Sequence, residues 1–303
     1  MADWKEQALA EALAGGKSWR KIAKDLGVSK STVSDYLRKE FSRKLIVPSE
    51  NSANILFIDI ETRQLTLEGF GLFNQNFSLE QIAEDWSILS FCAKWYKDDT
   101  EIYHDVSEMT EDELLVKLYE LFEQADFIVA HNGRRFDMKK IRARMIARGF
   151  KPHSPVRIID TLEIAKKEFG FTSNKLQYLT QLLCKKNKKS THAKFPGFLL
   201  WQEFVRGNPE AIQEMREYNI VDVTSLEELY DILAPWSSTL PNFEVYSSTP
   251  TDLETEWIDT GEYVYSNLGK YKKYRHSVTG QYRRGRVNLL TKAQRAALLS
   301  NIV

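Results

Sequence analysis

Apolar and polar positions alternate along the chain with periods that change from one part to the next. Near the N-terminus, apolar residues recur every three or four positions, as on one side of a helix. The middle of the chain mixes short apolar runs, typical of buried strands, with amphipathic helical segments. Near the C-terminus, aromatic and charged residues interleave, as on exposed strands. The pattern predicts three parts, residues 1–47, 53–235 and 240–303, and the middle one is of the α/β class.

The first part is predicted to form three short helices. The first ends before Gly15-Gly16, Ser18 can cap the second, and Gly27 follows the second as a turn residue. Two short helices joined by a glycine-containing turn form a helix-turn-helix unit. A small three-helix bundle that contacts other proteins is the alternative.

The stretch Ile22–Ser29, followed by Ser31-Thr32-Val33, resembles the helix-turn-helix of recombinases and bacterial regulators. The resemblance implies that the third helix enters the major groove of DNA. It also implies a set of exposed contact residues on that helix, namely Lys30, Ser31, Thr32, Ser34 and Arg38.

The middle part is predicted to alternate strands and helices. Strands are expected from Ile55, over 86–96, 101–106 and 127–130, and ending at 157–161, with helices over 111–124, 138–148, 176–183 and 210–233. The residues 62–76 are expected to form a loop.

Two carboxylates end the first of these strands. Asp59 and Glu61 lie two residues apart, so both side chains project from the same side of the strand. Buried like charges are costly unless something compensates them. A divalent cation is the usual remedy, and Mg²⁺ or Mn²⁺ is the usual ion for carboxylate oxygens. The alternative is a strand that simply runs out into a polar loop.

Three more candidate residues follow at element ends. Asp137 lies where a strand passes into a helix, a frequent place for active residues in α/β folds. Tyr218 and Asp222 lie four residues apart, so they share one face of the last long helix. Asn132 precedes Asp137 in the same loop, where it braces the loop, contacts substrate or serves only as a turn residue.

The order Asp59-x-Glu61, Asn132…Asp137, Tyr218-x-x-x-Asp222 resembles the three motifs of the DEDDy exonucleases. The resemblance implies a ribonuclease H-like mixed sheet flanked by helices and 3′→5′ hydrolysis of nucleic acid. Phosphodiester hydrolysis of this kind uses two ions, about 3.5–4 Å apart. We expect Asp59, Glu61, Asp137 and Asp222 to hold Mg²⁺ or Mn²⁺, and Tyr218 to orient the attacking water. Asp160 is expected to be structural or to support the metal ligands without binding metal itself, because the set of four acids is already complete.

Composition limits the remaining classes. No apolar run is long enough to span a membrane, and the N-terminus lacks a signal-peptide core, so a cytoplasmic protein is expected. The resemblance to exonucleases, which extends to a phage and bacterial group, implies that the cell is a bacterium or a phage-infected bacterium. Cys92 and Cys184 are too few for a disulfide framework or a four-cysteine metal site. The net charge is zero, yet residues 261–303 carry nine Lys and Arg against one Asp or Glu. Such an excess of basic residues at one end of the chain favours binding to the phosphates of nucleic acid.

The C-terminal part is predicted to contain a β-hairpin over 262–276, with its turn near Asn267–Gly269. The region resembles a zinc ribbon, but cysteines are missing at the expected ligand positions, near 247–251 and near His276 and Thr279. A structural zinc site needs four ligands, so no zinc is expected. A disordered basic tail is the alternative.

The sequence therefore predicts a metal-dependent 3′→5′ exonuclease acting on DNA, with a helix-turn-helix in front and a basic hairpin behind. RNA is a second substrate that this type of active site allows, a membrane is not expected, and protein partners are left open. Two alternatives stand beside it: a DNA endonuclease or transposase-like enzyme, and a DNA-binding regulator whose nuclease core is inactive.

Overall fold

The apolar run Ile55–Ile58 begins β1 (Ile55–Thr62), the central strand of a five-stranded sheet. The strand order is β5-β4-β1-β6-β7. The other strands are β4 (Ile88–Trp95), β5 (Glu101–Asp105), β6 (Phe127–Ala130) and β7 (Arg157–Asp160). β1 pairs antiparallel with β4 and parallel with β6, so the sheet is mixed. The predicted mixed sheet of an α/β fold is confirmed.

The computed structural model describes residues 4–14, 19–41, 53–71, 73, 75–187, 194–246 and 257–299. They fall into two compact units, the first of which ends at Ile232 and the second of which begins at Leu233. Among the described residues, no helix is long and apolar enough to cross a membrane.

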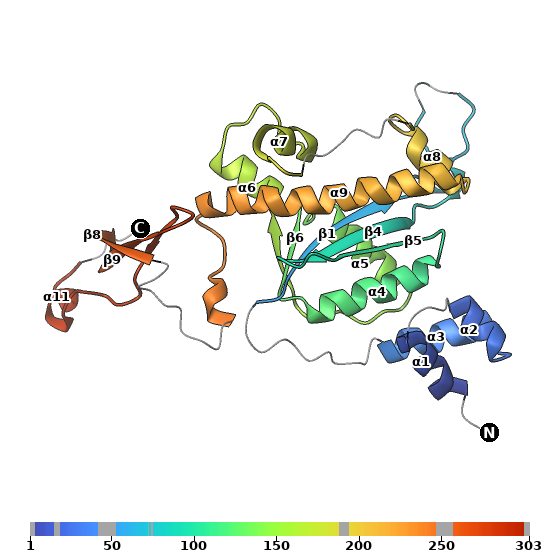
Figure 1. Cartoon of the computed structure of the whole chain (residues 1–303), viewed down its shortest axis with the longest axis horizontal. Coiled ribbons are helices and arrows are strands. Elements are labelled where there is room, and N and C mark those ends of the chain that lie inside the picture. The colour runs from blue at the N-terminus through green and yellow to red at the C-terminus, as the bar shows by residue number, and fades with distance from the viewer. Residues whose placement is uncertain are drawn as a thin grey trace. The chain divides into compact units, whose positions relative to one another are not determined.

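Helices cover both faces of the sheet. α4 (Glu111–Gln124) and α5 (Asp137–Ala147) lie on one face, and the long α9 (Pro209–Leu233) crosses the other (Figure 1). Alternate residues of β1 point to opposite faces. Leu56, Ile58 and Ile60 join the buried core that α4 and α5 complete. Asp59 and Glu61 consequently face α9.

Polar contacts and one aromatic pair hold α9 over the sheet. Lys94 of β4 forms an ion pair with Glu227. The Tyr96 hydroxyl donates to Asp231 Oδ1 at 2.8 Å. The ring of Tyr230 meets that of Phe57 edge-on, with centroids 5.4 Å apart. These contacts fix the rotation of α9 about its own axis relative to β1. That rotation determines which residues of α9 point toward the carboxylates of Asp59 and Glu61.

Several elements of the first unit were not predicted. The loop expected over 62–76 contains the short strand β2 (Thr66–Leu67), which pairs with β3 (Ile82–Glu84). The short 3₁₀ helix η1 (Leu79–Gln81) precedes β3. The strands were missed because two or three residues give no detectable alternation. Helices α6 (Thr161–Glu168) and α8 (Leu199–Val205) were also not predicted, whereas α7 (Leu176–Leu183) matches the helix expected over 176–183.

Three helices precede the sheet, namely α1 (Trp4–Ala14), α2 (Trp19–Asp25) and α3 (Lys30–Phe41). Gly27 follows α2 with φ +66°, the left-handed conformation that glycine adopts readily after a helix. The hydroxyl of Ser29 accepts from the Thr32 backbone N–H at 3.1 Å, which caps α3. Trp4 and Tyr36 pack edge-on at 5.4 Å and join α1 to α3. The three predicted helices are thus present, with Ser18 outside the described residues.

The second unit is built around a three-stranded antiparallel sheet, β10-β9-β8. Its elements are η2 (Ala234–Trp236), η3 (Phe243–Tyr246), β8 (Trp257–Ser266), β9 (Gly269–His276), β10 (Tyr282–Arg284) and α11 (Lys292–Ala296). The predicted hairpin is therefore longer at its start than expected and gains a third strand. Residues 247–251, where the first zinc ligands of a ribbon would fall, lie outside the described residues.

Candidate metal and catalytic site

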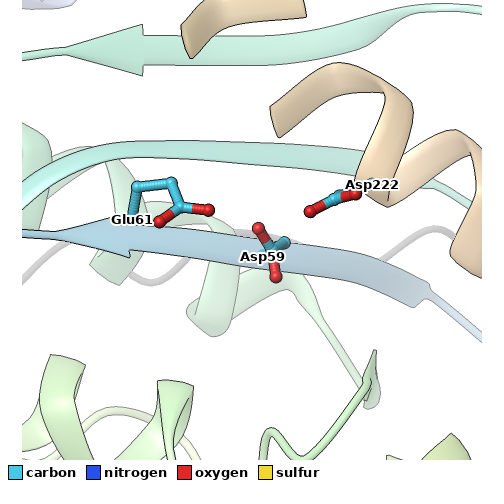
Figure 2. A group of neighbouring side chains, drawn as sticks. All are labelled: Asp59, Glu61 and Asp222. Atoms are coloured by element: carbon cyan, nitrogen blue, oxygen red, sulfur yellow. The ribbon is translucent and has the colours of Figure 1, made fainter. Parts of the chain in front are cut away.

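Three carboxylates from two elements converge beside β1. Asp59 and Glu61 project from the strand, and Asp222 approaches from α9 (Figure 2). One carboxylate oxygen of each lies within 4.8 Å of the others. Asp222 is buried, whereas Asp59 and Glu61 are half-buried. The strand period and the fixed rotation of α9 together produce this cluster.

The donor set fits a hard divalent cation. Three carboxylates supply oxygen ligands and negative charge in one place, which is the chemistry that Mg²⁺ and Mn²⁺ prefer. Cys92 lies opposite Asp59 on β4. Burial, together with the negative charge of Asp59, raises the pKa of the Cys92 thiol. The thiol therefore stays protonated and does not compete as a ligand at neutral pH.

Asp137, the fourth predicted acid, lies beside this cluster but is not among its three members. It is the first residue of α5 and is 3% exposed. Its Oδ1 accepts from the backbone N–H of Ile60 at 3.2 Å, between the two carboxylates of β1. Burial raises the pKa of Asp137 to about 7. Its role as a metal ligand stays a prediction.

Gly133 allows the loop before Asp137 to lie close to β6. A Cβ at Gly133 would come within 2.3 Å of the Ala130 Cβ, so only glycine fits. Asn132, next to it, has φ +67°, which supports the turn role considered for it. The Asn132 backbone N–H donates to Asp160 Oδ1 at 2.8 Å. Asp160 also caps α6 through the Leu162 N–H at 3.0 Å, as expected of a structural acid.

Asn219 is a site residue that the sequence analysis missed. It is fully buried on α9. Its Nδ2 donates to Asp59 Oδ2 at 2.7 Å, and its Oδ1 accepts from the Ser90 hydroxyl at 3.2 Å. The amide therefore fixes the Asp59 carboxylate and connects it to β4. Asn219 directly follows the predicted Tyr218, and its i, i+3 spacing from Asp222 puts both residues on one helix face. That spacing was the pattern from which its place in the site could have been inferred.

Trp201 of α8 is a second missed residue. Its indole N–H donates to Glu61 Oε2 at 3.0 Å. Its ring also meets that of Tyr218 edge-on, with centroids 5.9 Å apart at 78°. Trp201 thus joins a carboxylate of the cluster to the predicted water-orienting tyrosine. Tyr218 is half-buried, one turn before Asp222 on α9. No local pattern in the sequence indicates the hydrogen bond to Glu61, because that bond joins segments far apart in the chain.

The structure places the predicted DNA-contact residues on α3, with one correction. Lys30, Ser31 and Thr32 are exposed in its first turn. Ser34 is only 4% exposed, so the prediction that it is an exposed contact is wrong. It lies three residues before the buried Leu37, so it shares the inner side of the helix, where a small side chain fits. Arg38 lies on α3, and its contact role stays a prediction.

Comparisons with known proteins agree with the sheet topology. Residues 56–234 match the family model of the RNase_H superfamily. Among curated proteins, no match is found. A solved structure, the family B DNA polymerase from the hyperthermophilic archaeon Pyrobaculum calidifontis, resembles the chain with a TM-score of 0.48 and 15% sequence identity. The likeness covers 65% of this chain but only 27% of the polymerase. With this TM-score and sequence identity, we draw no conclusion from it. The family match spans more than half of the chain, which therefore belongs to the RNase_H superfamily.

Proposed function

We propose that the protein is a divalent-metal-dependent 3′→5′ exonuclease that hydrolyses DNA, at single strands or at 3′ ends, and releases nucleoside monophosphates. The observation that carries the proposal is the convergence of Asp59, Glu61 and Asp222 within 4.8 Å. The cluster lies inside the region that matches the RNase_H superfamily. A nuclease function follows from that family, and the polarity follows from the resemblance of the motifs to DEDDy exonucleases.

The roles of the residues follow from their positions. Asp59, Glu61 and Asp222 hold two ions, and Asp137 completes the set from the start of α5. When bound, the ions supply an activated water and stabilise the charge that develops on the leaving oxygen. Asn219 orients Asp59, and Trp201 orients Glu61, so the carboxylates are held in place before substrate arrives.

Tyr218 would orient the attacking water. Its ring lies against Trp201, whose indole is bonded to Glu61, so the phenol is held close to the carboxylate cluster. Asn132 contributes through its turn, which sets the path of the loop into Asp137.

DNA is the preferred substrate in this proposal because of α3. Lys30 and the hydroxyls of Ser31 and Thr32 are presented on its exposed first turn, as a groove-entering helix requires. Phosphate contacts from such residues would hold the enzyme on duplex DNA near the 3′ end that it degrades.

End-labelled oligonucleotides test this function. With Mg²⁺, a 3′-labelled single strand should release labelled mononucleotide at once, and a 5′-labelled strand should give a descending ladder. A covalently closed single-stranded circle should resist hydrolysis. Internal cuts, or hydrolysis of the circle at the rate of the linear strand, would favour an endonuclease or transposase-like enzyme. Stable duplex binding in EDTA with no hydrolysis in either metal would favour a DNA-binding regulator.

A further inference from the structure

The sheet of the second unit has two faces with different chemistry. Residues directly opposite in an antiparallel pair share a face, as do alternate residues along one strand. β10 pairs with β9 so that Tyr282 is opposite Arg275 and Arg284 is opposite Lys273. One face therefore carries Tyr271, Lys273, Arg275, Tyr282 and Arg284, which we name the cationic face.

Cations lie beside both tyrosines of the cationic face. Lys273 Nζ lies 4.7 Å from the centroid of the Tyr282 ring, and the Arg275 guanidinium carbon lies 5.6 Å from it. The Arg284 guanidinium carbon lies 4.3 Å from the centroid of Tyr271. Tyr282 is 55% exposed, so much of its ring is open to solvent. Exposed rings with cations beside them form a surface on which a base can stack while its phosphate meets a positive charge.

The opposite face holds the unit together. It carries Trp257, which is buried and packs edge-on against His276 at 4.9 Å. The guanidinium carbon of Arg283 lies 4.8 Å from the Trp257 ring centroid, and Arg283 Nη1 donates to Asn242 Oδ1 at 3.3 Å. Lys272 on this face pairs with Asp259 at 2.8 Å. Arg283 and Lys272 are thus engaged in packing or in an ion pair, whereas Lys270 lies 3.8 Å from the centroid of the exposed Tyr263 ring and has no ion pair among the described residues.

The positive charge of the cationic face is only partly neutralised. Its only carboxylate contact among the described residues is that of Lys273 with Glu262, at 2.7 Å. Arg275 and Arg284 form no ion pair within the described part of the chain. Over residues 261–303, nine Lys and Arg stand against one Asp or Glu. A polyanion is the ligand that this charge complements.

We propose that the cationic face binds a single strand of DNA, with phosphates on Lys273, Arg275 and Arg284 and a base stacked on Tyr282. The identity of the strand as a substrate rests on the proposed function. The face is a second binding surface, separate from the carboxylate cluster, and it would hold the strand whose end is hydrolysed. Stacking and phosphate contact need no particular base, so binding is expected to tolerate any sequence.

Fluorescence anisotropy of the full chain tests the proposal, with a labelled oligothymidine of about 20 nucleotides in EDTA. Tyr282→Ala should weaken binding at least about fivefold, because base stacking on one ring contributes that much or more. Tyr282→Phe keeps the ring and should bind like the wild type. Tyr265→Ala is the matched control, since Tyr265 is 69% exposed on the opposite face. Equal losses in the two alanine variants, or no loss in Tyr282→Ala, would overturn the assignment.

Salt dependence tests the cations separately. Removing two phosphate contacts in Arg275→Gln/Arg284→Gln should reduce the slope of log Kd against log salt by about 1.4, at about 0.7 per contact for single strands. Lys270→Gln/Lys272→Gln removes the same charge from the opposite face and should change the slope less. An equal change of slope in the two double variants would contradict binding to one particular face. Tighter binding of duplex DNA or of the matching RNA through Tyr282 would contradict single-stranded DNA as the ligand.

Hydrolysis separates this proposal from the proposed function. Because binding is measured in EDTA, a wild type that binds through Tyr282 but never hydrolyses DNA would refute only the exonuclease. A wild type that hydrolyses DNA while Tyr282→Ala binds normally would refute only the cationic face.

Discussion

The indole N–H of Trp201 donates to Oε2 of Glu61 at 3.0 Å, which ties helix α8 to the strand that carries the carboxylate pair. Groups that hydrogen-bond a metal ligand fix its orientation, and losing one commonly costs about 10- to 100-fold in metal affinity or activity. The same ring packs against Tyr218. Trp201 therefore acts through two residues of the site and is a positioning residue.

Trp201→Phe should raise the Mn²⁺ concentration needed for half-maximal hydrolysis by about tenfold, because the ring remains but the donor is lost. A titration of activity with Mn²⁺ measures this. Trp236→Phe is a control, since Trp236 is exposed on η2 of the second unit. The same metal dependence in Trp201→Phe and wild type would show that the hydrogen bond does not orient Glu61.

Asn219→Ala should lower the free energy of unfolding by about 1–3 kcal/mol, because it leaves buried polar groups of Asp59 and Ser90 without their amide partner. Urea unfolding followed by circular dichroism measures the change. Asn219→Asp conserves the size but adds a carboxylate beside Asp59, so it should reduce activity further than its effect on stability explains. Full activity in Asn219→Asp would contradict the role of the amide as a donor to Asp59.

Gly133→Ala should destabilise the protein by about 1–3 kcal/mol, the usual cost of forcing an extra methyl into a packed site. The new Cβ would meet that of Ala130 at 2.3 Å, and the loop that leads into Asp137 would have to move. Activity is expected to fall as well. Gly170→Ala is the matched control, because a Cβ there meets nothing within 4 Å. Thermal melts of the two variants should differ clearly, and indistinguishable melts would refute the packing argument.

His153 should make the protein less stable in mild acid. Burial lowers the pKa of His153, and its Nε2 accepts from Arg142 Nε at 3.2 Å, which requires the neutral ring. The unfolded chain binds the proton near pH 6.5 while the folded chain resists it, so this contribution is present above about pH 6.5 and is lost as the pH falls below it.

His153→Gln removes that titration and should lose less stability between about pH 7.5 and 5.5 than the wild type does. Chemical denaturation at the two pH values measures the difference. Equal losses in the two proteins would show that His153 does not contribute to the acid sensitivity.

Much of the site's framework could be predicted from local pattern. The apolar run before Asp59 forms the central strand, and the i, i+4 spacing of Tyr218 and Asp222 lies on a long helix. The structure brings Asp59, Glu61 and Asp222 together. These features follow from strand and helix periods, which the sequence displays directly.

The contacts that complete the site could not be predicted in the same way. Asn219 and Trp201 act through hydrogen bonds to residues far away in the chain, and no local period encodes such pairs. Asp137 directs an oxygen to the Ile60 amide, a choice that depends on how α5 packs under β1. Ser34 was expected to be exposed because it is polar, but helical spacing from Leu37 places it inside.

The central claim is that divalent ions held by the three carboxylates carry the hydrolysis. Its most direct test is the single-turnover rate on a 5′-labelled single strand in Mg²⁺, in Mn²⁺ and in EDTA, for wild type and for Asp59→Asn. We predict a 3′-shortening ladder with either metal, none in EDTA, and loss of the ladder in Asp59→Asn while its thermal melt stays close to that of the wild type. Hydrolysis that persists in EDTA, or a folded Asp59→Asn that cleaves at the wild-type rate, would contradict it.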